Sequence, residues 1–144
     1  MSFSQRIQRG QPEYCVANLY NTEASTAITV GQPVCYDYTT DADGVGVLIP
    51  TTAHLQFPAG LVASASIAAG DYGLVCTKGH FASGAVEGTT DVAIGDPLVL
   101  SNGNAYLTKA TLVTNAIGQF KACFVAGAAQ AANSVVATKV VVNC

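Results

Sequence analysis

One short pattern recurs along this chain: an apolar residue, a glycine, an aspartate or glutamine, and then a new apolar run. It occurs as ITVGQPVCY at Gly31, SIAAGDYGLVC at Gly70 and VAIGDPLVL at Gly95, and more loosely as NAIGQFKACF at Gly118. Glycine reaches the positive φ that other residues avoid, and the polar side chain that follows can bond the local backbone. We therefore expect each copy to be a tight corner that delivers the chain into a β-strand. The uneven spacing of the copies argues against a solenoid, whose repeats have a fixed period.

Between these corners, runs rich in Val, Ile, Thr, Tyr and Phe alternate with Gly, Asn, Asp and Pro, as strands alternate with turns. The predicted strands are residues 13–18, 27–30, 34–38, 45–49, 60–66, 73–78, 81–85, 98–100, 105–109, 119–125 and 135–142. Asn102 and Gly103 lie between two apolar runs and predict an antiparallel hairpin. Residues 126–133 could form a short helix or a loop. The fold class is all-β: a small β-barrel or β-sandwich with an extended N-terminal arm.

The length of 144 residues is that of one domain. Within it we distinguish residues 1–26, an N-terminal arm with the first strand, from the β-rich residues 27–144. Half of the residues are apolar and only 10% are charged, whereas soluble domains usually carry about a quarter charged residues. Such a chain leaves much uncharged surface, which suits a protein packed against other copies or another protein.

Several classes of partner and compartment are disfavoured by the same composition. No apolar run reaches the roughly 18 residues of a membrane span, and the N-terminus does not read as a secretory signal. The net charge is −3 and there is no basic block, so we expect neither nucleic acid nor membrane as a partner. Synthesis in the cytosol is expected.

The final strand and two tyrosines are candidates for protein contacts. Residues 135–142 are largely apolar on both faces, which is expected either for a central barrel strand or for a strand covered by a neighbouring subunit. We favour the subunit contact. Two tyrosines in one predicted strand project from the same face, and these could be contact residues or ordinary half-buried aromatics. The subunit-interface candidates are Val136, Val140, Val142, Tyr36 and Tyr38.

Catalytic and metal-binding motifs are weak in this sequence. The five cysteines are widely spaced without a CxxC pair, so we expect reduced thiols, mostly in the core. Cys76 and His80 are four positions apart, which leaves a small cytosolic thiol enzyme as an alternative function. The stretch DADG at residues 41–44 lacks the later ligands of a calcium loop, and TKGHFASGAVEG at residues 77–88 reads as an exposed loop rather than a phosphate cradle. We expect no enzyme activity, catalytic residue, metal or cofactor.

The order of these corners and strands resembles a known family. The segments FPAGLVASASIAAGDYGLVCTKGHF, AIGDPLVLSNGNAYLTKA and AIGQFKACFVAG, followed by the valine-rich end, look like the capsid decoration (cement) proteins of tailed bacteriophages. The likeness covers about residues 27–142. It implies a β-rich structural protein on the outer surface of an icosahedral head, commonly as a homotrimer, that clamps adjacent major capsid subunits against internal pressure.

The resemblance therefore implies two partners: the major capsid protein and further copies of the chain itself. No catalytic residues accompany such a family. The arm formed by residues 2–14 is our candidate for ordering on the capsid shell, although a plain flexible terminus is the alternative. Its candidate capsid contacts are Phe3, Arg6, Arg9 and Tyr14. Another alternative function is a phage tail or fibre module, or another virion module that binds surface sugars.

Overall fold

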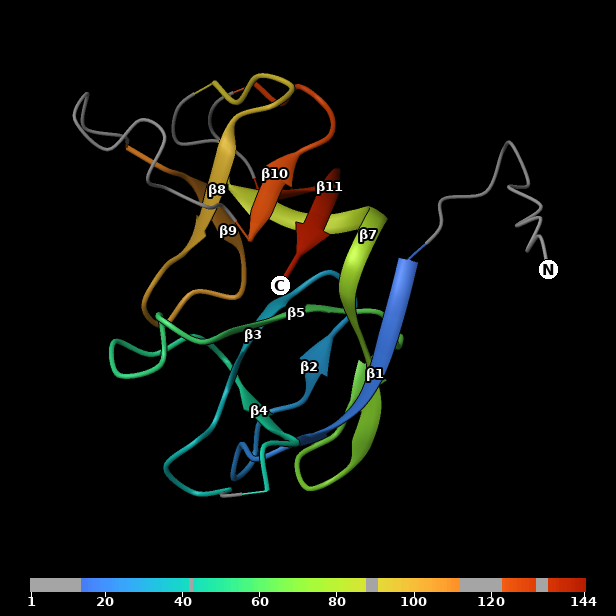
Figure 1. Cartoon of the computed structure of the whole chain (residues 1–144), viewed down its shortest axis with the longest axis vertical. Helices are drawn as coiled ribbons and strands as arrows, with labels where there is room; N and C mark the ends of the chain where they lie inside the picture. Colours follow the sequence, from blue (N-terminus) through green and yellow to red (C-terminus); the bar gives the residue numbers. More distant parts are fainter. Residues whose placement is uncertain (1–13, 42, 88–90, 112–122, 132–134) are drawn as a thin grey trace, which may run out of the picture.

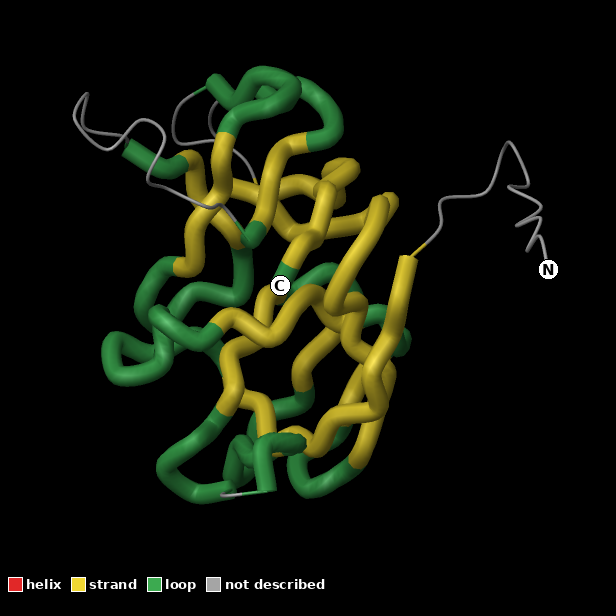
Figure 2. The backbone as a smooth tube through the Cα atoms, in the orientation of Figure 1, coloured by secondary structure: helices red, strands yellow, loops and turns green. Residues whose placement is uncertain are grey.

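A computed structural model describes residues 14–41, 43–87, 91–111, 123–131 and 135–144. The described residues form strands and loops without a helix (Figure 2), which confirms the all-β fold class. In this part of the chain the strands are β1 (Tyr14–Asn21), β2 (Ile28–Thr29), β3 (Pro33–Tyr36), β4 (Gly46–Leu48), β5 (Pro58–Val62), β6 (Ser66–Ile67), β7 (Tyr72–Glu87), β8 (Pro97–Leu100), β9 (Leu107–Lys109), β10 (Phe124–Ala126) and β11 (Val135–Asn143).

Strands β1, β4, β3, β5 and β7 pair in that order, and β7 returns to pair with β1. The circuit is a closed five-stranded barrel, so the barrel prediction is confirmed over the sandwich. β1 pairs with β7 over seven positions, from Tyr14 to Tyr20, and is therefore part of the barrel wall. The short β2–β6 pair places Ile28 opposite Ile67, and both side chains are buried in the core of this barrel.

The long strand β7 continues out of this barrel into a second circuit of pairings. There the order is β7, β11, β10, β8 and β9, and β9 returns to β7. Figure 1 shows β7 running from the lower barrel to the group of β8–β11 above it. The prediction of two strands, 73–78 and 81–85, and of an exposed loop at 77–88 was therefore wrong. β7 continues through Gly79, whose φ is 112°.

The second circuit repeats the pairing pattern of the first. Pro33 opposite Leu61 in the first circuit corresponds to Pro97 opposite Val125 in the second, each 64 positions later. Both circuits close through a short parallel pair, β1 with β4 and β7 with β9. The β2–β6 pair also has a counterpart, because Val92 bridges Gln130. The described strands thus form two barrels of one topology, in which β7 is the last strand of the first and the first strand of the second.

Two hydrophobic cores match the two circuits. The first contains Leu19, Ile28, Val34, Val47, Ala59, Val62, Ile67 and Val75. The second contains Leu61, Cys76, Phe81, Val86, Val92, Leu98, Leu107, Phe124, Ala126, Val140 and Val142. Neighbouring residues of a strand point to opposite faces, and so adjacent residues of β5 and of β7 enter different cores. These two strands form the wall that the cores share.

The glycine corners form as predicted wherever the structure describes them. Gly31, Gly70 and Gly95 have φ of 84°, 76° and 90°. In each corner the N–H of the residue after the glycine donates to the carbonyl three residues earlier, which closes a β-turn with glycine at its third position. The side chains of Gln32 and Asp96 accept from the first N–H of their turns, at 2.9 and 2.8 Å. The corner predicted at Gly118 lies outside the described residues.

Each corner also docks on the end of a neighbouring strand through two backbone hydrogen bonds. Gly31 donates to the Val62 carbonyl at 2.8 Å, and Val62 donates back to the next carbonyl of the corner at 3.0 Å. The corner at Gly70 makes the same pair with Asn21, and the corner at Gly95 makes it with Ala126. The recurring sequence pattern therefore encodes a turn that joins two strand ends, as well as a change of direction.

The hairpin prediction at Asn102 and Gly103 is confirmed, because β8 and β9 pair antiparallel with Leu100 opposite Leu107. The prediction for the last strand needs correction. β11 lies between β7 and β10, the central position that we did not favour. Val140 and Val142 are each 1% exposed within the core of their own chain. Their side chains are therefore withdrawn as subunit-interface candidates.

The expectation of five reduced cysteines is also wrong. Cys123 and Cys144 form a disulfide that joins the residue before β10 to the residue after β11, with their Cα atoms 4.9 Å apart. Cys35 and Cys76 are buried thiols, as expected, while Cys15 is exposed. The chain's last residue is thereby tied to the second barrel.

The corners make a matched test of the fold. Replacing Gly31 with alanine should lower the free energy of unfolding by about 3 kcal/mol or more, since the new Cβ would have an unfavourable positive φ and collide with the Ser83 carbonyl. Gly95→Ala has a similar φ but open space around the Cβ, so about 1 kcal/mol is expected. Urea unfolding of both variants measures the difference. Equal losses would contradict a docked role for the first corner.

Candidate interaction surfaces

Large apolar side chains remain exposed on several parts of the described surface. Singly scattered ones are ordinary, but groups of them mark contact sites. The exposed residues are Tyr14, Val16, Val30, Tyr38, Phe57, Tyr72, Leu74, Ile94, Val135 and Val136. Most of them fall into three groups, one on the outer side of β1 and β7, one beside β11, and one on the loops that follow β3 and β4.

The first group, which we call the tyrosine face, consists of Val16, Tyr20, Tyr72 and Leu74. The register places Tyr20 opposite Tyr72, and their ring centroids are 5.1 Å apart. Tyr72 is 60% exposed and Leu74 44%. Gly73 and Val75, which alternate with them along β7, point into the barrel and are buried. The strand period therefore forces these apolar side chains outward.

An acidic hollow adjoins the tyrosine face. It has a volume of about 410 Å³, and its lining combines Tyr20 and Tyr72 with Thr22, Thr40, Asp41, Asp43 and Val45. Asp43 is exposed and its N–H donates to the Asp41 carboxylate at 3.0 Å. An open hollow with aromatic rings and carboxylates can bind a partner that offers apolar surface together with hydrogen-bond donors or positive charge.

The second group is a concave surface, the alanine groove, beside β11 on the second barrel. Two adjoining hollows of about 800 and 320 Å³ make it up, and they share several lining residues. Ile94, in the corner before β8, lines the groove and is 72% exposed. Most of the lining is small and apolar, and Lys139 brings a positive charge. We define the groove by Ala82, Ile94, Gly127, Ala129, Ala137 and Lys139.

The third group lies over a buried polar network. Tyr38 packs against Phe57 and His54, with ring centroids 4.7 and 4.9 Å apart, and its hydroxyl donates to the Ala53 carbonyl. Beneath it, His54 Nε2 lies 3.6 Å from the carboxylate of Asp37, and His54 Nδ1 lies 2.7 Å from the Thr51 hydroxyl. Both His54 and Asp37 are buried.

A threonine, a histidine and an aspartate in line invite comparison with a catalytic triad. Here the threonine is three residues from the histidine, in a turn closed by the bond from the His54 N–H to the Thr51 carbonyl. The aspartate is occupied by the Thr22 hydroxyl at 2.8 Å and by the hydroxyl and N–H of Thr39. We interpret the cluster as the anchor that joins the loop after β3 to the loop after β4.

Burial alone would raise the pKa of Asp37, but hydrogen bonds from Thr22, Thr39 and Thr40 outweigh that effect and lower the pKa to about 2. The carboxylate is thus held ionised inside the anchor. The sequence analysis assigned no role to His54 and did not single out Asp37. Thr39 and Thr40, which follow Asp37 closely in the sequence, are a local signal for a polar anchor. Thr22 reaches Asp37 only through the fold.

The Cys76 and His80 pair is not assembled as a catalytic dyad would be. Cys76 points into the second core, and burial raises the pKa of its thiol to about 11. A nucleophilic cysteine needs the opposite shift. His80 is exposed on the other side of Gly79. The two side chains therefore lie in different environments, one in the core and one on the surface.

The other predicted contact residues fall in separate places. Tyr14 begins β1, is 47% exposed and packs edge-on against Phe81. Tyr36 is partly buried against the first core, so it does not join Tyr38 on the surface. Val136 is 44% exposed and lines the larger hollow of the alanine groove. Phe3, Arg6 and Arg9 lie outside the described residues.

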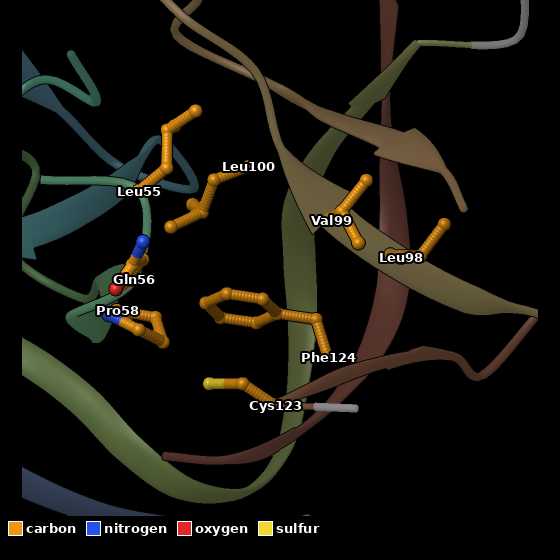
Figure 3. Close-up of a pocket in the computed structure, with 8 residues that line it drawn as sticks. All are labelled: Leu55, Gln56, Pro58, Leu98, Val99, Leu100, Cys123 and Phe124. Atoms are coloured by element: carbon orange, nitrogen blue, oxygen red, sulfur yellow. The ribbon is translucent and has the colours of Figure 1, made fainter. Parts of the chain in front are cut away.

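A further apolar pocket lies between the two barrels, and Figure 3 shows its lining. Its volume is about 380 Å³. Leu55 and Gln56 from the loop before β5, with Pro58 at the start of β5, line one side. The other side is formed by β8, by Phe124 of β10 and by Cys123 just before it. Gln56 is the polar side chain in this lining, so the pocket can accommodate an apolar group but offers few atoms for hydrogen bonding or catalysis.

Within the described ranges, no group of three or more His, Cys, Asp or Glu side chains is placed to hold a metal ion. In those ranges there is also no helix with the length and hydropathy to cross a bilayer.

The Asp37 anchor predicts an acid dependence of stability. Its pKa in the folded state is below the ordinary value of 3.8, so the stabilisation is complete above about pH 4 and is lost as pH falls toward 2. Asp37→Asn should lose roughly 1–2 kcal/mol at pH 7 and show a flatter stability profile between pH 4 and 2. Urea unfolding across that range measures both. An unchanged profile would remove Asp37 from the anchor.

Comparison with known proteins adds no family to this description. No protein-family model matches the chain, and the search of curated proteins finds no significant match either.

Proposed function

We propose that this chain is a structural virion protein that binds the outer surface of an icosahedral phage head and clamps adjacent major capsid subunits. The main support for the proposal is that a rigid, closed double barrel exposes apolar surfaces on both of its barrels. A clamp needs a scaffold that does not deform and faces that adhere without charge. The resemblance of the corner and strand order to phage decoration proteins supports the same reading.

Multivalency supplies the physical mechanism. One contact on the shell need only be modest, because copies that are joined to one another bind their later sites from a high effective concentration. Linked contacts raise the overall affinity by about a hundredfold or more. The proposed partners are the major capsid protein and other copies of this chain. The proposed location is the outside of the capsid, after synthesis in the host cytoplasm.

The arm provides the first test. Purified chain is mixed with heads assembled from the cognate major capsid protein, and occupancy is measured by sedimentation together with the temperature at which the heads rupture. Removal of residues 2–12, which include Phe3, Arg6 and Arg9, should lower occupancy at least about tenfold if the arm orders on the shell. Tyr14→Ala tests the neighbouring exposed contact on β1.

The outcomes separate the arm from the clamp. Full occupancy and unchanged heat resistance after the deletion would remove the arm from the binding surface. Absence of binding by the intact chain, to both expanded and unexpanded heads, would overturn the clamp itself. A variant at an exposed site on the loop after β4, Thr52→Ala, serves as the control and should bind as the intact chain does.

A second candidate function has one specific observation in its favour. The acidic hollow combines Tyr20 and Tyr72 with Asp41 and Asp43, and aromatic and acidic side chains in a pocket are expected of a tail or fibre module that binds surface sugars. That function predicts saturable binding of an oligosaccharide, lowered about tenfold or more by Tyr72→Ala. Titration calorimetry with host surface polysaccharide fragments measures it. Heats indistinguishable from buffer would dismiss the candidate.

A further inference from the structure

We infer that copies of this protein associate head to tail, with the tyrosine face of one copy seated in the alanine groove of the next. The inference deepens the proposed function, since multivalent clamping depends on self-association, but it is tested without any capsid. Among the described residues, no segment covers the tyrosine face or the alanine groove, and the two surfaces lie on different barrels.

The repeated topology allows the two surfaces to be compared position by position. Tyr20 opposite Tyr72 in the first barrel corresponds to Ala85 opposite Ala137 in the second, each 65 positions later. Leu74 likewise corresponds to Lys139. At the two tyrosine positions the framework therefore presents large side chains on the first barrel and alanines on the second, where Ala137 lines the larger hollow and Lys139 is long and charged. Large side chains seated in a hollow lined by small ones give the close packing that a stable interface core needs.

Charge is complementary in the same arrangement. The tyrosine face borders the hollow that contains Asp41 and Asp43, and the groove carries Lys139. Ion pairs at an interface rim contribute little affinity, but they orient partners and disfavour wrong pairings. Two tyrosine faces set against each other would bring four carboxylates together. The charges therefore favour face-to-groove contact over a symmetric face-to-face dimer.

A contact between two different surfaces has a geometric consequence. Each copy keeps one free tyrosine face and one free groove after the first contact, so association continues until the rotation closes a ring or a chain forms. The repeated step is the same whatever the final number of copies. A ring of three would present three arms to a capsid.

Sedimentation velocity over a range of concentrations tests the contact. The double variant Tyr72→Ser/Leu74→Ser should weaken self-association about thirtyfold or more, as expected for loss of a buried aromatic anchor. Ala137→Glu should do the same by filling the groove and opposing Asp41 and Asp43. The matched controls are Val30→Ser and Ala65→Glu, both exposed sites outside the two surfaces. Thermal melts establish that every variant folds.

Mixing gives the sharper result. The double variant keeps an intact groove and Ala137→Glu keeps an intact tyrosine face, so an equimolar mixture should form 1:1 pairs and nothing larger. Asp43→Lys and Lys139→Glu should each weaken association in isolation, and their combination in one chain should recover at least part of it. Such recovery is the signature of a pairing between these two charges.

Three results would overturn the inference. The first is an intact chain that stays monomeric at all concentrations; if it still binds heads, the clamp proposal survives alone. The second is a mixture of the two variants that forms no pairs, which would indicate a symmetric contact or another surface. The third is loss of oligosaccharide binding in the double variant with unchanged self-association, which would assign the tyrosine face to sugars.

Discussion

The fold depends on a small hydrogen-bonded unit that occurs three times in the described residues. A glycine at positive φ lets a turn close tightly enough for its N–H and the next carbonyl to bond one residue of a neighbouring strand. Without that unit, the strand ends at Asn21, Val62 and Ala126 would leave backbone groups buried and unpaired, at a cost of about 1–3 kcal/mol each. The unit recurs because two barrels are built on one plan.

Sequence reasoning succeeded where the signal is local. A glycine followed by a polar residue and an apolar run identified the corners at Gly31, Gly70 and Gly95, since positive φ is a property of one residue. The hairpin at Gly103 was readable for the same reason. Alternation of apolar and polar residues located most strands within a few positions, and it gave the fold class.

Long-range features were not readable in this way. Gly79 and Gly84 looked like loop punctuation, yet β7 passes through both, and Gly84 is needed because a Cβ there would press on Val140 and Leu61. The disulfide between Cys123 and Cys144 depends on which strands become neighbours, which spacing does not reveal. The candidate surfaces were missed in part too. Tyr72 and Leu74 alternate with inward residues, but only the barrel's closure determines which face is outside.

The shared strand has a mechanical consequence. Most proteins with two lobes join them by a linker about which they can bend, whereas here the polypeptide crosses from one lobe to the other inside a hydrogen-bonded wall (Figure 1). Val75 and Cys76 are adjacent along β7 and enter different cores. Tilting one barrel relative to the other would therefore disturb the packing of both cores. The two barrels should therefore move as one rigid body, so the spacing of their outer faces should stay fixed under mechanical load.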